Sequence, residues 1–159
     1  MSAALYTATL VTALGCGLIA GAFFAFSSFV MGALGRLPAA QGIAAMQSIN
    51  ILAVTPVFMT ALFGTAAACL GLSAWGVISA DGWTTALVLA GSVLYLVGTV
   101  GVTMVCNVPL NNSLAKLDPQ DAGAAARWEE FVRRWTAWNH VRTVAALAAT
   151  AALTLALHL

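Results

Sequence analysis

The sequence predicts an all-α protein, a four-helix transmembrane bundle with a cytoplasmic interfacial helix before the fourth span. The composition is the first reason: 62% of the 159 residues are apolar and only 7% are charged, which excludes an ordinary soluble domain. The mean hydropathy of +0.96 agrees. The clustering of the few charges is the second reason, because it leaves long uncharged stretches: residues 1–35, 37–80, 82–115 and, apart from His158, 143–159.

Each uncharged stretch is close to or above the length of one span, because crossing a hydrocarbon core of about 30 Å takes roughly 20 helical residues. We place the spans at residues 5–34, 51–79, 83–106 and 138–158, in a single integral membrane domain of residues 1–159. Pro109 follows the third span, and we expect that helix to kink or end there because proline lacks a backbone N–H and disfavours helical geometry at Val108. Pro56 predicts a second kink.

The basic residues of the loops lie on one side of the predicted bundle. With four spans, the 1–2 and 3–4 loops share a side, while the termini and the 2–3 turn share the other. The first side holds Arg36, Lys116, Arg127, Arg133 and Arg134, whereas the second holds only Asp81. The positive-inside rule therefore predicts a multi-pass protein of the cell membrane, with these two loops cytoplasmic and both termini outside. The expected interfacial aromatics divide likewise, into Tyr6, Trp75 and Trp83 outside and Trp128, Trp135 and Trp138 inside.

The segment DPQDAGAAARWEEFVRRW, residues 118–135, predicts the interfacial helix that leads into the fourth span. Asp118 suits the N-cap and Pro119 suits the first helical position. Apolar side chains recur at helical spacing on one face of this segment, opposite its charged side chains. The apolar set is Trp128, Phe131, Val132 and Trp135.

Polar side chains gather at the cytoplasmic ends of three predicted spans. They are Gln47 and Asn50 before the second span, Asn107, Asn111 and Asn112 at the end of the third, and Asn139, His140 and Arg142 at the start of the fourth. Spacings of three or four residues place Gln47 with Asn50, Asn107 with Asn111, and Asn139 with Arg142 on shared helical faces. Since the outer half has no comparable set, the asymmetry favours a site.

Each polar residue also has a structural explanation. Arg142 lies about one turn inside its span with no Asp or Glu in any span, so it indicates a functional site, unless its side chain snorkels to the interface. The amides are explained equally well by helix capping and interhelical hydrogen bonds. His140 is a base or a solvated imidazole.

Aromatic side chains lie at the same depth as the polar cluster. Phe23, Phe24, Phe26, Phe29 and Phe58 either pack the bundle or wall a slot for a flat apolar ligand. Gly17, Gly21 and Ala25 form a stripe of small residues for close helix packing, within the monomer or between protomers of a homo-oligomer.

Patterns typical of several other sites are missing from the sequence. It has no HxxxH or ExxH pattern for a metal, no glycine-rich phosphate loop and no basic tract for nucleic acid. We therefore expect no metal, no cofactor and no nucleic-acid partner. Chemistry with amides, one arginine and one imidazole suits stabilisation of an enolate-like anion.

Three blocks resemble the signature blocks of the anthrone oxygenase family, small four-span membrane proteins that include the noranthrone monooxygenases. The blocks are AAMQSIN (44–50), NVPLNNSLA (107–115) and WTAWNHVRT (135–143). The resemblance implies oxidation of an anthrone, a three-ring aromatic ketone, to the anthraquinone by O2 without metal or flavin.

The resemblance also implies roles for the polar cluster. Asn107, Asn111 and Arg142 would stabilise the oxyanion, with His140 as the base. Substrate binding would fall to Gln47, Asn50 and Asn139 for orientation, Trp138 for stacking, and Phe26 and Phe58 for the apolar wall. Two other functions fit the same residues: a binding protein or carrier for a small apolar molecule, and a structural membrane protein whose amides tie the bundle together.

Overall fold

The computed structural model describes residues 2–79 and 82–159, and every regular element in these ranges is a helix. The first arm joins α1 (Ala3–Ala25), the π-helical segment η1 (Phe26–Val30) and α2 (Met31–Gly35). The second arm joins α3 (Ala39–Leu52) and α4 (Pro56–Ser79). The third joins α5 (Gly82–Val93), the π-helical segments η2 (Leu94–Gly101) and η3 (Thr103–Asn107), and α6 (Val108–Ala115). The fourth arm is α7 (Ala124–Ala156) alone.

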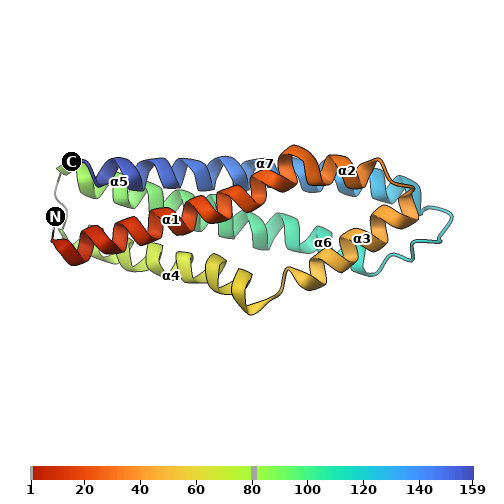
Figure 1. Cartoon of the computed structure of the whole chain (residues 1–159), viewed down its shortest axis with the longest axis horizontal. Helices are drawn as coiled ribbons and strands as arrows, with labels where there is room; N and C mark the ends of the chain where they lie inside the picture. Colours follow the sequence, from red (N-terminus) through yellow and green to blue (C-terminus); the bar gives the residue numbers. More distant parts are fainter. Residues whose placement is uncertain (1, 80–81) are drawn as a thin grey trace.

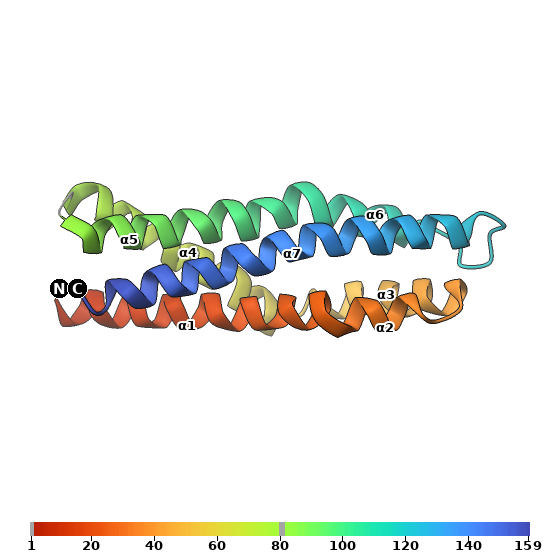
Figure 2. The same cartoon turned by 90° about the horizontal axis from the view of Figure 1, so that it is seen from above.

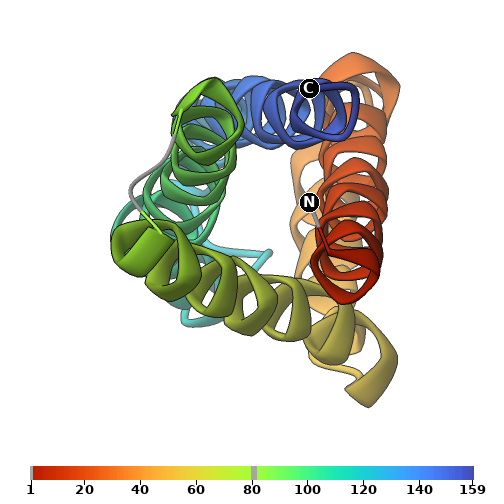
Figure 3. The same ribbon diagram turned by 90° about the vertical axis from the view of Figure 1, so that its left-hand side faces the viewer.

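Successive arms run in opposite directions along the long axis (Figures 1 and 2). Seen end-on, they occupy the corners of a square (Figure 3). Helices α1 and α5 each contact both α4 and α7, which closes the bundle. Both termini lie at one end, and the α2–α3 and α6–α7 connections lie at the other (Figure 1).

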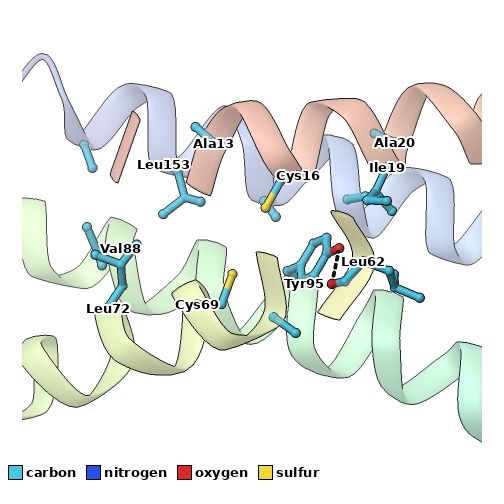
Figure 4. Close-up of a cluster of buried hydrophobic side chains, with 14 of the residues drawn as sticks. Ala13, Cys16, Ile19, Ala20, Leu62, Cys69, Leu72, Val88, Tyr95 and Leu153 are labelled. Carbon is cyan, nitrogen blue, oxygen red and sulfur yellow. Dashed lines mark hydrogen bonds between the residues drawn. The ribbon is translucent and has the colours of Figure 1, made fainter. Parts of the chain in front are cut away.

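Two clusters of buried apolar side chains hold the arms together. The cluster nearer the termini joins α1, α4, α5, η2 and α7 (Figure 4), and within it the Tyr95 hydroxyl donates to the carbonyl oxygen of Leu62 at 3.1 Å. The second cluster joins α2, α3, α6 and the first half of α7, with Met31, Ile43 and Trp128 among its members. The polar site described below lies where the two clusters meet.

Within the described ranges, three helices are long and apolar enough to cross a membrane: Ala3–Gly35, Pro56–Ile78 and Gly82–Ala115. The chain is thus a membrane protein with a helical bundle fold, as predicted. The span at residues 138–158 stays a prediction, because α7 is not one of these three helices; the predicted span itself begins with the polar side chains of Asn139, His140 and Arg142. With 33 residues, α7 is about 50 Å long, which exceeds a hydrocarbon core of about 30 Å.

The second predicted span, residues 51–79, begins too early. The backbone turns at residues 53–55, and α4 begins at Pro56. The Thr55 hydroxyl accepts a hydrogen bond from the backbone N–H of Phe58 at 3.4 Å, so Thr55 caps a helix whose first residue is proline. Pro56 therefore starts a helix where we predicted a kink, and the α3–α4 connection swings away from the other arms (Figures 1 and 3).

The helix does not end at Pro109, one of the two outcomes that we predicted there. Val108 has helical angles, φ −60° and ψ −45°, and the helix continues through Ala115. The π-helical segment η3 explains the difference, because the backbone N–H of Val108 bonds to the carbonyl of Thr103, five residues back. Pro109 then falls in the first turn of α6, where the missing N–H is tolerated.

The predicted interfacial helix is the first part of α7, which continues unbroken into residues 138–156. Asp118 does not cap this helix, which begins at Ala124 after Gly123. The Asp118 carboxylate instead accepts the backbone N–H of Gln120 at 2.9 Å and so stabilises a turn in the preceding loop.

The aromatic side chains predicted at the cytoplasmic interface divide into two groups. Trp128 and Trp135 are only 3% and 5% exposed, so they belong to the core and the prediction for them is wrong. Trp138 is 40% exposed, and at the other end Trp83 is 80% exposed. Asp81, predicted in the outer turn, lies outside the described residues.

Candidate functional site

Arg142 is the centre of the polar site. It lies on α7 and is only 4% exposed. Its Nη2 donates to Asn139 Oδ1 at 2.6 Å and its Nη1 donates to Thr103 Oγ1 at 3.2 Å. The guanidinium carbon lies 4.0 Å from the centre of the Phe23 ring and 5.1 Å from that of Trp135. Arg142 thus contacts both apolar clusters, and the faces of the two rings stabilise its charge.

Asn139 fixes Arg142 from one turn earlier on α7. Its Nδ2 donates to the carbonyl oxygen of Phe23 and to Ser27 Oγ, both at 2.7 Å. Ser27 Oγ also lies 3.2 Å from Thr143 Oγ1. Because the amide nitrogen is held by the first arm, the amide oxygen faces the guanidinium.

All three π-helical segments lie beside this part of α7. Ser27 belongs to η1, and Thr103 and Asn107 belong to η3, while Thr99 of η2 points its hydroxyl at the Arg142 carbonyl, 3.5 Å away. A π-helical turn shifts the register of side chains around the helix and is frequent at functional sites. Here the π turns place hydroxyl and amide groups toward α7.

A cavity of about 610 Å³ adjoins Arg142. Four polar side chains contribute to its lining, Asn50, Thr103, Asn111 and Arg142, and the rest is almost entirely apolar. The apolar lining includes Phe23, Phe26, Met46, Phe58, Met59, Leu62, Met104 and Trp135. Its size and its few polar groups are typical of a small-molecule site.

Two buried donors at the cavity have no hydrogen-bond partner, Arg142 Nε and Asn50 Nδ2. Arg142 also has no carboxylate partner among the described residues. The ion pair found there joins Arg134 to Glu130 at 3.2 Å, on the surface of α7. A buried charge without a counter-ion and a buried donor without an acceptor are both costly. Arg142 and Asn50 are therefore the lining residues with unsatisfied polar groups next to the cavity.

The structure brings five of the predicted site residues to this cavity: Arg142, Asn111, Asn50, Phe26 and Phe58. Asn139 lies directly behind them, bonded to Arg142. Asn111 is oriented by a hydrogen bond from Trp135 Nε1 to its Oδ1, 2.8 Å long.

The remaining four predicted site residues do not line the cavity. Asn107 is fully buried and its Nδ2 donates to the Trp135 carbonyl at 3.2 Å, while its Oδ1 has no partner. Gln47 Nε2 donates to the carbonyl oxygens of Leu114 and Leu117 at 2.8 and 2.9 Å. His140 and Trp138 are exposed side chains of α7.

Sequence reasoning missed the hydroxyl groups of the site, Thr103 and Ser27, and the position of Trp135 against Arg142. Threonine and serine are common throughout apolar helices, so nothing in the sequence singles out these two. For Trp135 a signal was present: it stands seven residues before Arg142, two helical turns away on the same face.

Among the residues that the structure describes, no three His, Cys, Asp or Glu side chains come together as a metal site requires. Cys16 and Cys69 are buried in the apolar cluster nearer the termini (Figure 4), and Cys106 is half-buried on η3.

Comparison with known families gives a match over more than half of the chain. The family model described as anthrone oxygenase matches residues 54–152. The match includes the blocks at 107–115 and 135–143, and so Asn107, Asn111, Asn139 and Arg142; Gln47 and Asn50 precede it. No curated protein and no solved structure matches the chain.

Proposed function

The chain belongs to the anthrone oxygenase family, and from that premise we propose that it oxidises an anthrone-like polycyclic aromatic ketone to a quinone with O2, without metal or flavin. The observation that carries the proposal is the apolar cavity of about 610 Å³ with one buried, uncompensated cation in its wall. A flat apolar molecule with a developing oxyanion complements such a site.

The chemistry balances with the substrate and O2 alone. Loss of a proton from the ring CH2 of an anthrone gives a conjugated anion, the anthrolate. This electron-rich anion passes one electron to O2, and the two radicals combine into a C–O bond, giving a peroxide at the former CH2 carbon. The peroxide anion takes up the first proton. Loss of the second C–H proton then breaks the O–O bond and forms the carbonyl, and the hydroxide released combines with that second proton to give water.

Different residues of the cavity lining bind different parts of the substrate. We assign stabilisation of the oxyanion to Arg142, with Asn111 beside it and Asn139 and Thr103 holding the guanidinium in place. Phe26 and Phe58 form part of the wall for the aromatic rings. We regard Asn107 and Gln47 as structural residues that hold helices together, because their amides bond to backbone carbonyls of other segments.

We propose that the substrate enters from the lipid. The cavity lining includes several apolar side chains that are also exposed, among them Leu52, Val54, Phe63 and Met104. The first two lie at the α3–α4 break, where the second arm leaves the bundle (Figure 1). Such a rim is favourable in hydrocarbon and costly in water.

The proposed function is tested with protein in nanodiscs, mixed with anthrone in air-saturated buffer. We expect quinone absorbance to rise faster than in protein-free nanodiscs, with one O2 consumed per quinone. Arg142→Ala should lower the protein-dependent rate by about 100-fold or more, the usual cost of losing an oxyanion donor. The matched control is Arg133→Ala, an exposed arginine of the same helix, which should leave the rate unchanged. Absence of protein-dependent turnover with several anthrones would exclude this function.

One observation favours a second candidate, a binding protein or carrier for a small apolar molecule. No carboxylate and no imidazole is part of the described cavity lining. The lining therefore provides no general base for the first proton transfer. Thermal stabilisation of the protein by an anthrone or its quinone, with no product formed, would identify this function.

A further inference from the structure

We propose that the cavity binds its ligand as an anion, an ionised enol or phenol whose oxygen contacts Arg142, and that Asn50 binds a second oxygen of the same ligand. The inference rests on the proposed function because it concerns the same cavity. It goes further by specifying the ionisation state of the ligand and the placement of its oxygens.

None of the described residues supplies a negative charge to Arg142. An arginine side chain remains protonated in proteins. The groups that contact this one are neutral: the Asn139 amide oxygen, the Thr103 hydroxyl and the two aromatic rings. Partial charges on neutral groups compensate a full charge only in part, and Nε still lacks an acceptor. A ligand oxyanion beside the guanidinium would supply the missing charge.

Asn50 provides the second contact. It lies near the end of α3, in a different arm from Arg142, and both residues line the cavity. Its Nδ2 is buried and has no partner. Because an unsatisfied buried amide is costly, the acceptor expected here belongs to the ligand. A ligand that bonds to both residues must therefore carry two separated oxygens and reach between the two arms.

The absence of a base in the described lining explains why the ionised form would be selected. Around Arg142, the first arm presents Phe23 and Ser27, and the third presents Thr99 and Thr103 together with the half-buried thiol of Cys106. On α7 itself, His140 is exposed and lies outside the lining. The ligand thus loses its proton before or during entry, which conjugated enols and phenols do far more readily than simple ketones.

The test uses two dyes that do not react with O2, 2-hydroxyanthraquinone and 2-methoxyanthraquinone, with protein in phosphatidylcholine nanodiscs. The hydroxy compound changes from yellow to red when it ionises, so its spectrum reports the bound form directly. We expect bound dye to show the red phenolate band at a pH where dye in empty nanodiscs is still yellow. We also expect it to bind at least about tenfold more tightly than the methoxy compound. A bound dye that stays yellow, or equal binding of both dyes, would overturn the inference.

Variants at the two residues locate the contacts. Arg142→Met should remove the phenolate band of the bound dye, whereas Arg142→Lys, which keeps a charge, should retain part of it. Asn50→Leu should weaken dye binding by about tenfold while the red band remains; Asn112→Leu, an exposed amide of α6, is its control. Equal dye affinity in Asn50→Leu and wild type would refute the second contact.

The wild-type spectrum decides the first contact even where a variant fails to fold. The dyes are not turned over, so their binding is independent of the oxygenase assay. Turnover of anthrone with no preference for the ionised dye would reject this inference alone. A bound phenolate without turnover of any anthrone would reject the proposed oxygenase function alone.

Discussion

Buried amides in this bundle bond mostly to backbone carbonyls of other helices. Asn139 donates to the Phe23 carbonyl and Asn107 to that of Trp135, while Gln47 donates to two carbonyls at the end of α6. A buried side-chain amide without a partner is costly, especially beside lipid, and a backbone carbonyl oxygen can accept its N–H with a second lone pair. At the scale of single residues, the explanation by interhelical hydrogen bonds therefore holds for part of the polar cluster, and the cavity accounts for the rest.

Gln47 provides a test of this division. Gln47→Leu removes two hydrogen bonds of 2.8 and 2.9 Å. The Leu114 carbonyl keeps the backbone N–H of Leu117 at 3.0 Å, but the Leu117 carbonyl loses the Gln47 donor, so we expect the free energy of unfolding to fall by about 1 to 3 kcal/mol. Ligand affinity of the folded protein should be unchanged. Chemical unfolding in detergent measures the first quantity and dye binding the second, with Gln41→Leu, an exposed residue of α3, as control. Loss of dye binding without loss of stability would show instead that Gln47 contributes to the binding site.

His140 tests where the first proton goes. Its side chain is exposed on α7 and does not line the cavity, although the sequence predicted it as the base. We expect His140→Ala to retain the protein-dependent rate of quinone formation within about twofold, since no group of the site loses a contact. A decrease similar to that of a missing general base, about 100-fold, would show that the imidazole reaches the substrate.

At the scale of helices, the π-helical segments depend on close approach between arms. Gly98 lies in η2, and a Cβ there would be 2.5 Å from Cβ of Ala145 on α7. We expect Gly98→Ala to destabilise the bundle by about 1 to 3 kcal/mol. The matched control is Gly71→Ala on α4, where a Cβ meets nothing within 4 Å; this change should be neutral or stabilising, because alanine favours helix. Thermal unfolding of both variants checks this, and equal stability would mean that η2 adjusts without cost.

Helix existence was predictable from the sequence, and local helix geometry was not. Long uncharged stretches are sufficient to predict the apolar arms. The start of α4 was also readable, because threonine followed by proline is a helix-start signal at Thr55 and Pro56. The π-helical segments have no such signal, since their composition matches that of the surrounding helix and contacts between arms select them.

At the scale of the whole molecule, the depth of the site was predictable but its membership was only partly so. Counting residues along the spans was enough to bring Asn50, Asn111 and Arg142 to one end. The rotation of each helix about its axis decides which side chains face inward, and η1 and η3 change that rotation just before the site. Thr103, within η3, therefore lies in the site. Gln47, on the separate helix α3, bonds instead to carbonyls at the end of α6.

The orientation of the bundle in the membrane is a prediction that labelling can test. The positive-inside rule places the α6–α7 connection in the cytoplasm and the C-terminus outside. With the native cysteines changed to alanine, Leu159→Cys should react with a membrane-impermeant maleimide in intact cells. Gly123→Cys, in the connection before α7, should react only after the membrane is opened. The reverse pattern would invert the topology.

The break between α3 and α4 has a consequence for which substrate concentration controls binding, the one in the buffer or the one in the membrane. If ligands arrive through an apolar rim that includes Leu52 and Val54, the quantity that sets occupancy is their mole fraction in the bilayer. Adding empty vesicles at fixed total substrate would then slow the reaction by surface dilution, although the amount per volume of buffer is unchanged. Membrane-rich cells would accordingly need more substrate for the same flux, and a water-soluble analogue of equal shape would be a poor competitor.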